Sequence, residues 1–147
     1  MLKQWLHDAT IVLEKKVENW PQALEICARP LLEAGIIAPE YVTAIMEQHR
    51  RLGPYYVLAP GLAMPHARPE EGAKGVGLSL LKLEQGVSFT AGEFDPVDII
   101  VMLAAPDNHS HIATLSALAE LFSSDEDMKQ LHQAQTLEEI KKIIERF

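Results

Sequence analysis

The stretch PVDIIVMLAAPDNHSHIATLSALAELF, residues 96–122, contains two hydrophobic patterns of different period. Residues 96–105 form a nearly continuous apolar run, which is typical of a buried strand. From Asn108 onward the apolar residues recur at helical spacing, in one stripe made of Ile112, Leu115, Leu118, Ala119 and Phe122. The stretch therefore predicts a strand followed by a helix, each with an apolar face that needs a core.

The rest of the middle of the chain is also β-rich. Residues 75–83, GVGLSLLKL, predict a strand, and residues 84–89 fit a turn that leads into another short strand. Residues 55–65 divide into two short strand-like pieces around a Pro-Gly pair. A further short strand is expected over residues 11–13, near the start of the chain.

Two helices are expected before the β-rich middle. Residues 19–35 form the first, with Asn19 near its start and with Pro30 bending it or removing a hydrogen bond. Pro39 begins the second helix, which runs to about Arg51. A glycine follows each helix and favours its end at that point.

Two shorter helices are expected after the helix of the opening stretch. Ser124 can cap one that runs to about Gln133, and Thr136 with Glu139 forms a capping box for the last. Helices, then strands, then helices around one core predict an α/β fold, an α/β/α sandwich with a central mixed β-sheet flanked by helices. No G-x-G-x-x-G or P-loop pattern occurs, so a nucleotide-binding domain of those types is not expected.

The composition is that of one ordinary globular domain over residues 1–147. Hydrophobic residues make up 48% and charged residues 23% of the chain, and no linker or repeat divides it. The net charge of −8 argues against nucleic acid as a partner, since phosphate binding needs a basic patch. No apolar run can span a bilayer and the first residues lack the features of a signal peptide, so we expect a cytoplasmic location without membrane insertion.

The motifs argue against three kinds of reactive site. The single cysteine, Cys27, allows neither a disulfide nor a thiolate metal cluster, and a thiol on a buried helix face is usually inert. No G-x-S-x-G pattern marks a nucleophilic serine. Zinc is not expected, because His109 and His111 lie two residues apart on a helix and point away from each other. No metal site is therefore predicted.

Among the six histidines, His66 is the first candidate for a reactive group. Pro65 stiffens the chain immediately before it, and the nearby glycine and prolines indicate a constrained connection at a sheet edge. Arg68, two residues later, can neutralise an anion next to the imidazole. A loop histidine without a function is the alternative that these local features leave open.

His111 is the second candidate. If Asn108 caps the helix, His111 lies in the first turn and faces inward at the edge of the core. The free N–H groups and the positive dipole end of a helix N-terminus favour an anion there. A core-edge histidine that donates to a backbone carbonyl is the alternative. Three other histidines are expected on solvated helix faces, namely His7, His49 and His132.

These candidates lie in a pattern that resembles a known family. LAMPH after Gly61, with HIATLSALAELF further along, is similar to the enzyme IIA domains of the bacterial phosphoenolpyruvate-dependent sugar phosphotransferase system (PTS), in the mannitol/fructose superfamily. The similarity covers nearly the whole chain. Within the superfamily, GPYYVLAPGLAMPHARPEEGA most resembles the ascorbate-specific component, through its G-P-Y, A-P-G and H-A-R-P runs.

The resemblance implies a role for each candidate. His66 corresponds to the histidine that becomes phosphorylated, and His111 to the second active-site histidine, which holds the phosphoryl group or orients its partner. Arg50, by its spacing from His66, and Arg68, in the ascorbate-like run, are candidates for phosphate contact. The implied fold is a mixed sheet with helices on both faces, and no metal, nucleotide or other cofactor is required.

The resemblance also implies protein partners. Phosphate would arrive from a phosphohistidine on the carrier HPr and leave to a cysteine of the IIB component of the same permease. Leu62, Met64 and Ala67 are candidates for the surface on which these partners dock. Cys27 is not that cysteine, because it lies within a helix and has no phosphate-cradling loop. The oligomeric state stays open, a homodimer included.

The leading hypothesis is a phosphoryl-carrier component for sugar uptake, with ascorbate as the expected sugar. The alternative is a regulatory IIA-like protein, which accepts phosphate on His66 and signals by binding a target in a phosphorylation-dependent way. A third hypothesis is an interaction module without phosphoryl transfer. The pairing of His66 with His111 on another element counts against it.

Overall fold

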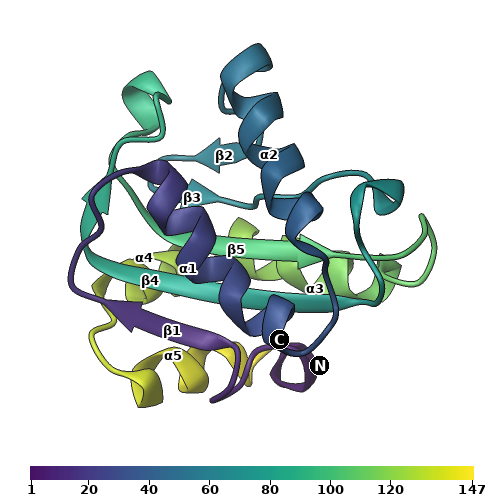
Figure 1. Cartoon of the computed structure of the whole chain (residues 1–147). Coiled ribbons are helices and arrows are strands. Elements are labelled where there is room, and N and C mark those ends of the chain that lie inside the picture. Colours follow the sequence, from purple (N-terminus) through teal and green to yellow (C-terminus); the bar gives the residue numbers. More distant parts are fainter.

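A five-stranded mixed sheet forms the centre of the computed structural model, which describes every residue from Met1 to Phe147 (Figure 1). The strands are β1 (Ile11–Glu14), β2 (Val57–Ala59), β3 (Leu62–Ala63), β4 (Gly77–Val87) and β5 (Val97–Ala104). Their order in the sheet is β1-β4-β5-β3-β2. β4 and β5 pair antiparallel in the middle, while β1 runs parallel to β4 and β3 parallel to β5. The two longest strands are thus paired on both sides.

Helices cover both faces of this sheet. α1 (Trp20–Glu33) and α2 (Pro39–Leu52) lie on one face, and α3 (Ile112–Ser123), α4 (Asp125–Gln133) and α5 (Leu137–Ile144) lie on the other (Figure 1). Three 3-10 turns complete the fold: η1 (Leu2–Gln4) precedes β1, η2 (Pro69–Glu71) lies between β3 and β4, and η3 (Gly92–Phe94) lies between β4 and β5. The predicted α/β/α sandwich is therefore confirmed. None of the helices combines the length and the apolar character needed to cross a membrane.

Side-chain caps begin three of the helices at the predicted residues. The Asn19 side chain accepts a hydrogen bond from the backbone N–H of Gln22, and Ser124 and Thr136 cap α4 and α5 in the same way. A cap of this kind contributes about 1 kcal/mol to stability. At α5 the Glu139 carboxylate accepts from the hydroxyl of Thr136, and not from the backbone N–H that a capping box uses.

Each face of the sheet has its own apolar core. Leu80 and Leu81, neighbours in β4, are both fully buried, but Leu81 packs under α1 and α2 whereas Leu80 packs under the other three helices. Ile100 and Val101 divide between the two cores in the same way. Burying one such side chain contributes about 1.5–3 kcal/mol. This two-sided burial explains why β5 is an unbroken apolar run and not an alternating one.

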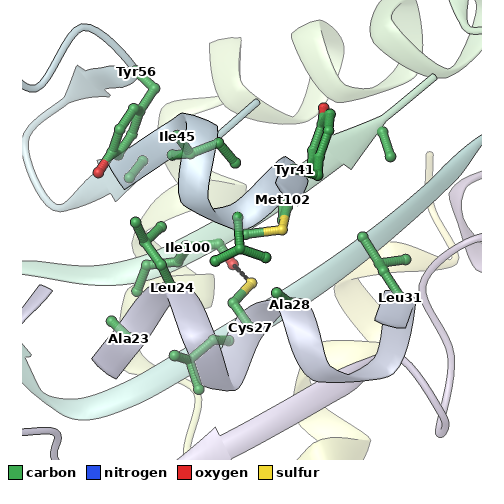
Figure 2. Close-up of a cluster of buried hydrophobic side chains, with 14 of the residues drawn as sticks. Ala23, Leu24, Cys27, Ala28, Leu31, Tyr41, Ile45, Tyr56, Ile100 and Met102 are labelled. Atoms are coloured by element: carbon green, nitrogen blue, oxygen red, sulfur yellow. Dashed lines mark hydrogen bonds between the residues drawn. The ribbon is translucent and has the colours of Figure 1, made fainter. Parts of the chain in front are cut away.

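Cys27 belongs to the core between α1, α2 and the sheet (Figure 2). Its Sγ atom lies 3.4 Å from Ser79 Oγ and 3.5 Å from the carbonyl oxygen of Ile100. Burial raises the pKa of the Cys27 thiol to about 11, so the thiol stays uncharged at neutral pH. Cys27 is thus a core residue, as predicted.

The end of the sheet where β5 begins carries a network of polar and charged side chains. Lys82 is only 5% exposed, and its Nζ atom lies 3.4 Å from Asp98 Oδ2 and donates to the carbonyl oxygen of Leu83. The other oxygen of Asp98 lies 2.7 Å from His132 Nδ1. The network therefore joins β4, β5 and the last turn of α4. The prediction that His132 is a solvated residue is wrong, because its side chain contacts Asp98.

His49 is buried, which corrects the prediction of a solvated helix position. It is 3% exposed, because it follows buried residues of α2 at four-residue spacing. Its ring stacks on Trp20 with centroids 3.8 Å apart, and its two nitrogens lie 2.7 Å from Tyr56 Oη and 2.9 Å from Thr90 Oγ1. Burial lowers the pKa of His49. His7 is exposed, but it precedes β1 in a bend and not in a helix.

The turn predicted within residues 84–89 is wrong. β4 continues to Val87, with a shift of register against β5 between Lys82 and Val87. Gly86 lies at this irregularity, and a Cβ atom there would approach Pro96 Cβ to 2.9 Å. The glycine therefore allows close approach of the neighbouring chain segment. A glycine with this role inside a strand resembles a turn residue when only its neighbours in the sequence are considered. The two strand-like pieces predicted within residues 55–65 are confirmed as β2 and β3.

Candidate functional site

A cleft of about 300 Å³ opens beyond the end of β5, and we call it the His66 cleft. Five segments form its walls: α2, the connection from α2 to β2, the segment that follows β3, the end of β5, and the connection into α3. His66, Ala67, Arg68 and His111 all line it, although His111 is far from the other three in the sequence. The structure thus brings four of the predicted site residues together.

One nitrogen of His66 is held by the backbone. Nδ1 lies 2.9 Å from the carbonyl oxygen of Met64, and a carbonyl can only accept a hydrogen bond. Nδ1 is therefore the protonated nitrogen of the neutral ring, and Nε2 carries the free lone pair. Pro65, between the two partners, is buried, and its fixed φ stiffens this short loop. The arrangement leaves Nε2 as the ring nitrogen of His66 whose lone pair is available.

Two tyrosines fasten the segment that carries His66. Tyr55 donates from Oη to the carbonyl oxygen of His66 at 2.7 Å. Tyr41, from α2, donates to the carbonyl oxygen of Leu103 at 2.7 Å and accepts from the backbone N–H of Ala67 at 3.1 Å. Tyr41 thus ties the segment after β3 to α2 and β5, and Tyr55 ties it to the turn before β2. His66 sits on a rigid part of the scaffold and not on a free loop.

Arg68 supplies a positive charge to the His66 cleft. Its side chain is exposed and takes part in none of the ion pairs of the protein. Its backbone N–H donates to the Glu71 carboxylate at 2.9 Å, which fixes the chain where η2 begins. The guanidinium is therefore available to an anion in the cleft.

His111 is the residue before α3, which corrects the prediction that Asn108 caps this helix. The Asp107 carboxylate accepts from the backbone N–H groups of His109 and Ser110, at 2.8 and 2.7 Å. These hydrogen bonds close a turn and lower the pKa of Asp107 to about 2. Because the turn occupies residues 107–110, α3 begins only at Ile112. His111 then occupies the cap position, close to where the free N–H groups of α3 begin.

The Nδ1 atom of His111 is buried and has no hydrogen-bond partner. A buried N–H without an acceptor costs about 1–3 kcal/mol, whereas an unprotonated ring nitrogen costs less when left alone. The neutral ring therefore favours the tautomer with its proton on Nε2. This makes His111 a hydrogen-bond donor through Nε2, the opposite of His66, whose Nε2 is an acceptor.

Three of the predicted site residues lie outside the His66 cleft. Arg50 is stacked over Trp20, with Cζ 5.5 Å from the ring centroid, whereas Gln48 of the same helix lines the cleft. Residues two apart on a helix point about 200° apart, so both cannot face the cleft. Leu62 is 2% exposed and belongs to the core, so it cannot form part of a docking surface. Met64 is half-buried against the same core.

Sequence reasoning missed several residues of the His66 cleft. Tyr41 and Tyr55 were not singled out, because a tyrosine in a helix or strand pattern is equally well explained as core. Asp107, the residue before Asn108, does carry a recognisable signal, because Asp and Asn side chains often accept hydrogen bonds from backbone N–H groups two and three residues later. That rule applied to Asp107 predicts the later start of α3.

Nearly the whole chain matches a family model. The model is described as "Phosphoenolpyruvate-dependent sugar phosphotransferase system, EIIA 2", and it matches residues 4–147. The chain belongs to this family. The resemblance seen in the sequence is therefore confirmed for the EIIA 2 family.

Individual relatives agree with membership of the EIIA 2 family. The ascorbate-specific PTS system EIIA component of Escherichia coli (strain K12) is 38% identical, over 93% of this chain and 90% of the relative. The solution structure of the mannitol-specific cryptic phosphotransferase enzyme IIA of Escherichia coli matches with a TM-score of 0.92 and 38% identity, over 99% of both chains. The complex of enzyme IIAMTL with phosphorylated enzyme IIBMTL from Escherichia coli matches in fold, with a TM-score of 0.80 at 22% identity.

Proposed function

We propose that this EIIA protein accepts a phosphoryl group on His66 from phosphorylated HPr and passes it to a IIB component. The single observation that carries the proposal is the pairing of two histidines with opposite tautomers in the His66 cleft. His66 offers a lone pair at Nε2, because Met64 holds its Nδ1 proton, while His111 favours a donor at Nε2. One ring can attack phosphorus, and the other can donate to a phosphoryl oxygen.

The transfer needs no group beyond the two proteins. The lone pair of His66 Nε2 attacks phosphorus, a new N–P bond forms, and the N–P bond of the donor phosphohistidine breaks, so the electron pair returns to the donor imidazole. In the second step a cysteine thiolate of the IIB component attacks phosphorus, and the electron pair of the broken bond returns to Nε2. Charge on the transferring group is stabilised by hydrogen-bond donors that line the cleft, here His111 and Arg68.

The surface around the His66 cleft suits a protein partner. Leu52, Leu58 and Ile112 are three exposed apolar side chains, and each is close in the chain to residues that line the cleft. Ala67 adds a small partly exposed residue next to His66. Exposed apolar groups of this kind favour a docking surface. The net charge of −8 assists encounter with basic partners.

Ascorbate is the sugar that we propose for the cognate permease. The support is the similarity to the ascorbate-specific component together with the run GPYYVLAPGLAMPHARP. A similarity of equal identity to a mannitol-specific enzyme IIA makes the comparison with mannitol the necessary test. Phosphorylated protein should pass its label to a IIB component of the ascorbate type faster than to one of the mannitol type. Equal or inverted rates would contradict ascorbate and leave the carrier function standing.

The carrier function is tested by incubation with enzyme I, HPr and radiolabelled phosphoenolpyruvate. Wild type should acquire acid-labile label, His66→Ala should acquire none, and His7→Ala should match wild type, since His7 is exposed and outside the cleft. Label in His66→Ala would remove His66 from its role. Absence of label in wild type would remove HPr as the donor.

A further inference from the structure

We infer that Tyr55 is a positioning residue for His66, an inference that rests on His66 receiving the phosphoryl group as proposed above. Two contacts join the residues. Tyr55 Oη donates to the carbonyl oxygen of His66 at 2.7 Å, and the two rings meet edge to face, with centroids 5.8 Å apart and planes at 80°. Tyr55 thus holds both the backbone and the imidazole of one residue.

The ring of Tyr55 is itself held in place by a neighbouring side chain. Its ring meets the ring of Tyr56 edge to face, with centroids 5.1 Å apart. Tyr56 is fully buried, and its hydroxyl lies 2.7 Å from His49 Nδ1 in the core. Burial raises the pKa of Tyr55 to about 12, so its hydroxyl keeps its proton and remains a donor at every physiological pH.

The contacts leave little freedom to the imidazole of His66. Nδ1 is held by Met64, the carbonyl group by the Tyr55 hydroxyl, and one side of the ring by the Tyr55 ring. Of the two ring nitrogens, only Nε2 is without a hydrogen-bond partner. In-line attack requires this atom in one place, and a displacement of about 1 Å can cost about 100-fold in rate. Tyr55 therefore acts on the rate of transfer and not on the affinity for the donor.

The structure offers two variants of Tyr55 and a matched control. Tyr55→Phe removes the hydroxyl and keeps the ring, while Tyr55→Leu removes both contacts. Tyr56→Phe makes the same chemical change one residue further on, where the hydroxyl contacts His49 and not His66. It should lower stability without altering His66. Each variant is first compared with wild type by circular dichroism, so that only folded protein is assayed.

Two measurements test the inference. With phosphoramidate as donor, whose P–N bond breaks as the Nε2–P bond forms and ammonia leaves, Tyr55→Phe should slow phosphohistidine formation about 3- to 10-fold. Tyr55→Leu should slow it further. With phosphorylated HPr the maximal rate should fall while the half-saturating concentration stays constant. In nitrogen-15 NMR of the unphosphorylated protein, both Tyr55 variants should lose part of the Nδ1–H tautomer of His66.

The outcomes separate this inference from the proposed function. If Tyr55→Leu matches wild type in rate and tautomer, or if Tyr56→Phe changes His66 as much as Tyr55→Phe does, Tyr55 is not a positioning residue. If wild type forms no phosphohistidine with either donor, the proposed function fails. The NMR measurement then still decides whether Tyr55 holds the His66 ring, since it needs no phosphoryl transfer.

Discussion

Nδ1 of His66 lies 2.9 Å from the carbonyl oxygen of Met64, only two residues earlier in the chain. So short a loop is possible because Pro65 between them has a fixed φ and contributes no N–H that would need a partner. The choice of reactive nitrogen is therefore built into three consecutive residues, before any partner protein arrives.

The first prediction follows from this contact. The phosphoryl group should be bonded to Nε2 of His66, because Nδ1 is occupied by its hydrogen bond to Met64. Phosphorus-31 and nitrogen-15 NMR of the phosphorylated protein distinguish the two isomers directly. Phosphorylation on Nδ1 would contradict the tautomer assigned here.

His111 should affect transfer more than folding. Replacing it with alanine removes a donor to the transferring group, which typically costs about 100- to 1,000-fold in rate. We expect His111→Ala to accept phosphate slowly and to pass it on poorly, with the two steps measured by rapid quench. His111→Gln retains an amide donor and should recover part of the rate. If His111→Ala transfers at the wild-type rate, His111 has only a structural role.

Arg68 should matter through its charge. Arg68→Gln removes the unpaired cation of the His66 cleft, and the loss of one charged hydrogen bond corresponds to about a 10- to 100-fold slower acceptance of phosphate. Arg29→Gln, an exposed arginine of α1 outside the cleft, is the control for the change in net charge. Equal rates for the two variants would show that charge at Arg68 is not used.

His49 should make the protein less stable in mild acid. Its pKa is lowered in the folded state by burial, so the unfolded chain binds a proton more readily. The stabilisation is complete above the unfolded pKa of about 6.5 and is lost as the pH falls from there through the lower pKa of the folded state. Urea unfolding at pH 7.5 and pH 5 measures it. His49→Gln should reduce the difference in the free energy of unfolding between pH 7.5 and pH 5. If that difference stays the same in the variant, the pH dependence comes from other groups.

Gly61 should tolerate alanine less well than Gly35. Both glycines have positive φ, +76° and +73°, so each substitution carries about 1–2 kcal/mol of backbone strain. A Cβ atom on Gly35 meets nothing within 4 Å, whereas one on Gly61 comes within 2.8 Å of the His132 ring and 2.9 Å of Asp98 Oδ1. Gly61→Ala should therefore lower the free energy of unfolding by more than Gly35→Ala does. An equal loss in urea unfolding would mean that the His132–Asp98 contact adjusts without cost.

The fold was predictable because its signs are local in sequence. The capping residues Asn19, Ser124 and Thr136 each act on an N–H group three residues away, and the apolar run of β5 needs no knowledge of its neighbours. What failed depends on distant groups. Gly86 marks a turn in isolation, but in the folded chain it accommodates Pro96, the residue before β5.

The site was predictable in part for the same reason. His66 and Arg68 lie in one short run, and His111 precedes a recognisable helix. The sequence pattern and the family resemblance therefore identify the same three residues as site candidates. Arg50 was misplaced because spacing along the chain does not say which way a helical side chain points, and it faces Trp20. Tyr55 gave no sign at all, since its partner is a backbone carbonyl and any residue has one.

The charged pair at the far end of the sheet has a consequence for how this sequence can change. Lys82 and Asp98 lie on adjacent strands, largely out of water, with His132 attached to the same carboxylate. Removing one member of a buried ion pair costs about 3–5 kcal/mol, whereas exchanging both for apolar residues can be neutral. Substitution of Lys82 or Asp98 alone should therefore be rare in evolution, whereas replacement of both together should be tolerated. We expect positions 82 and 98 to covary among relatives.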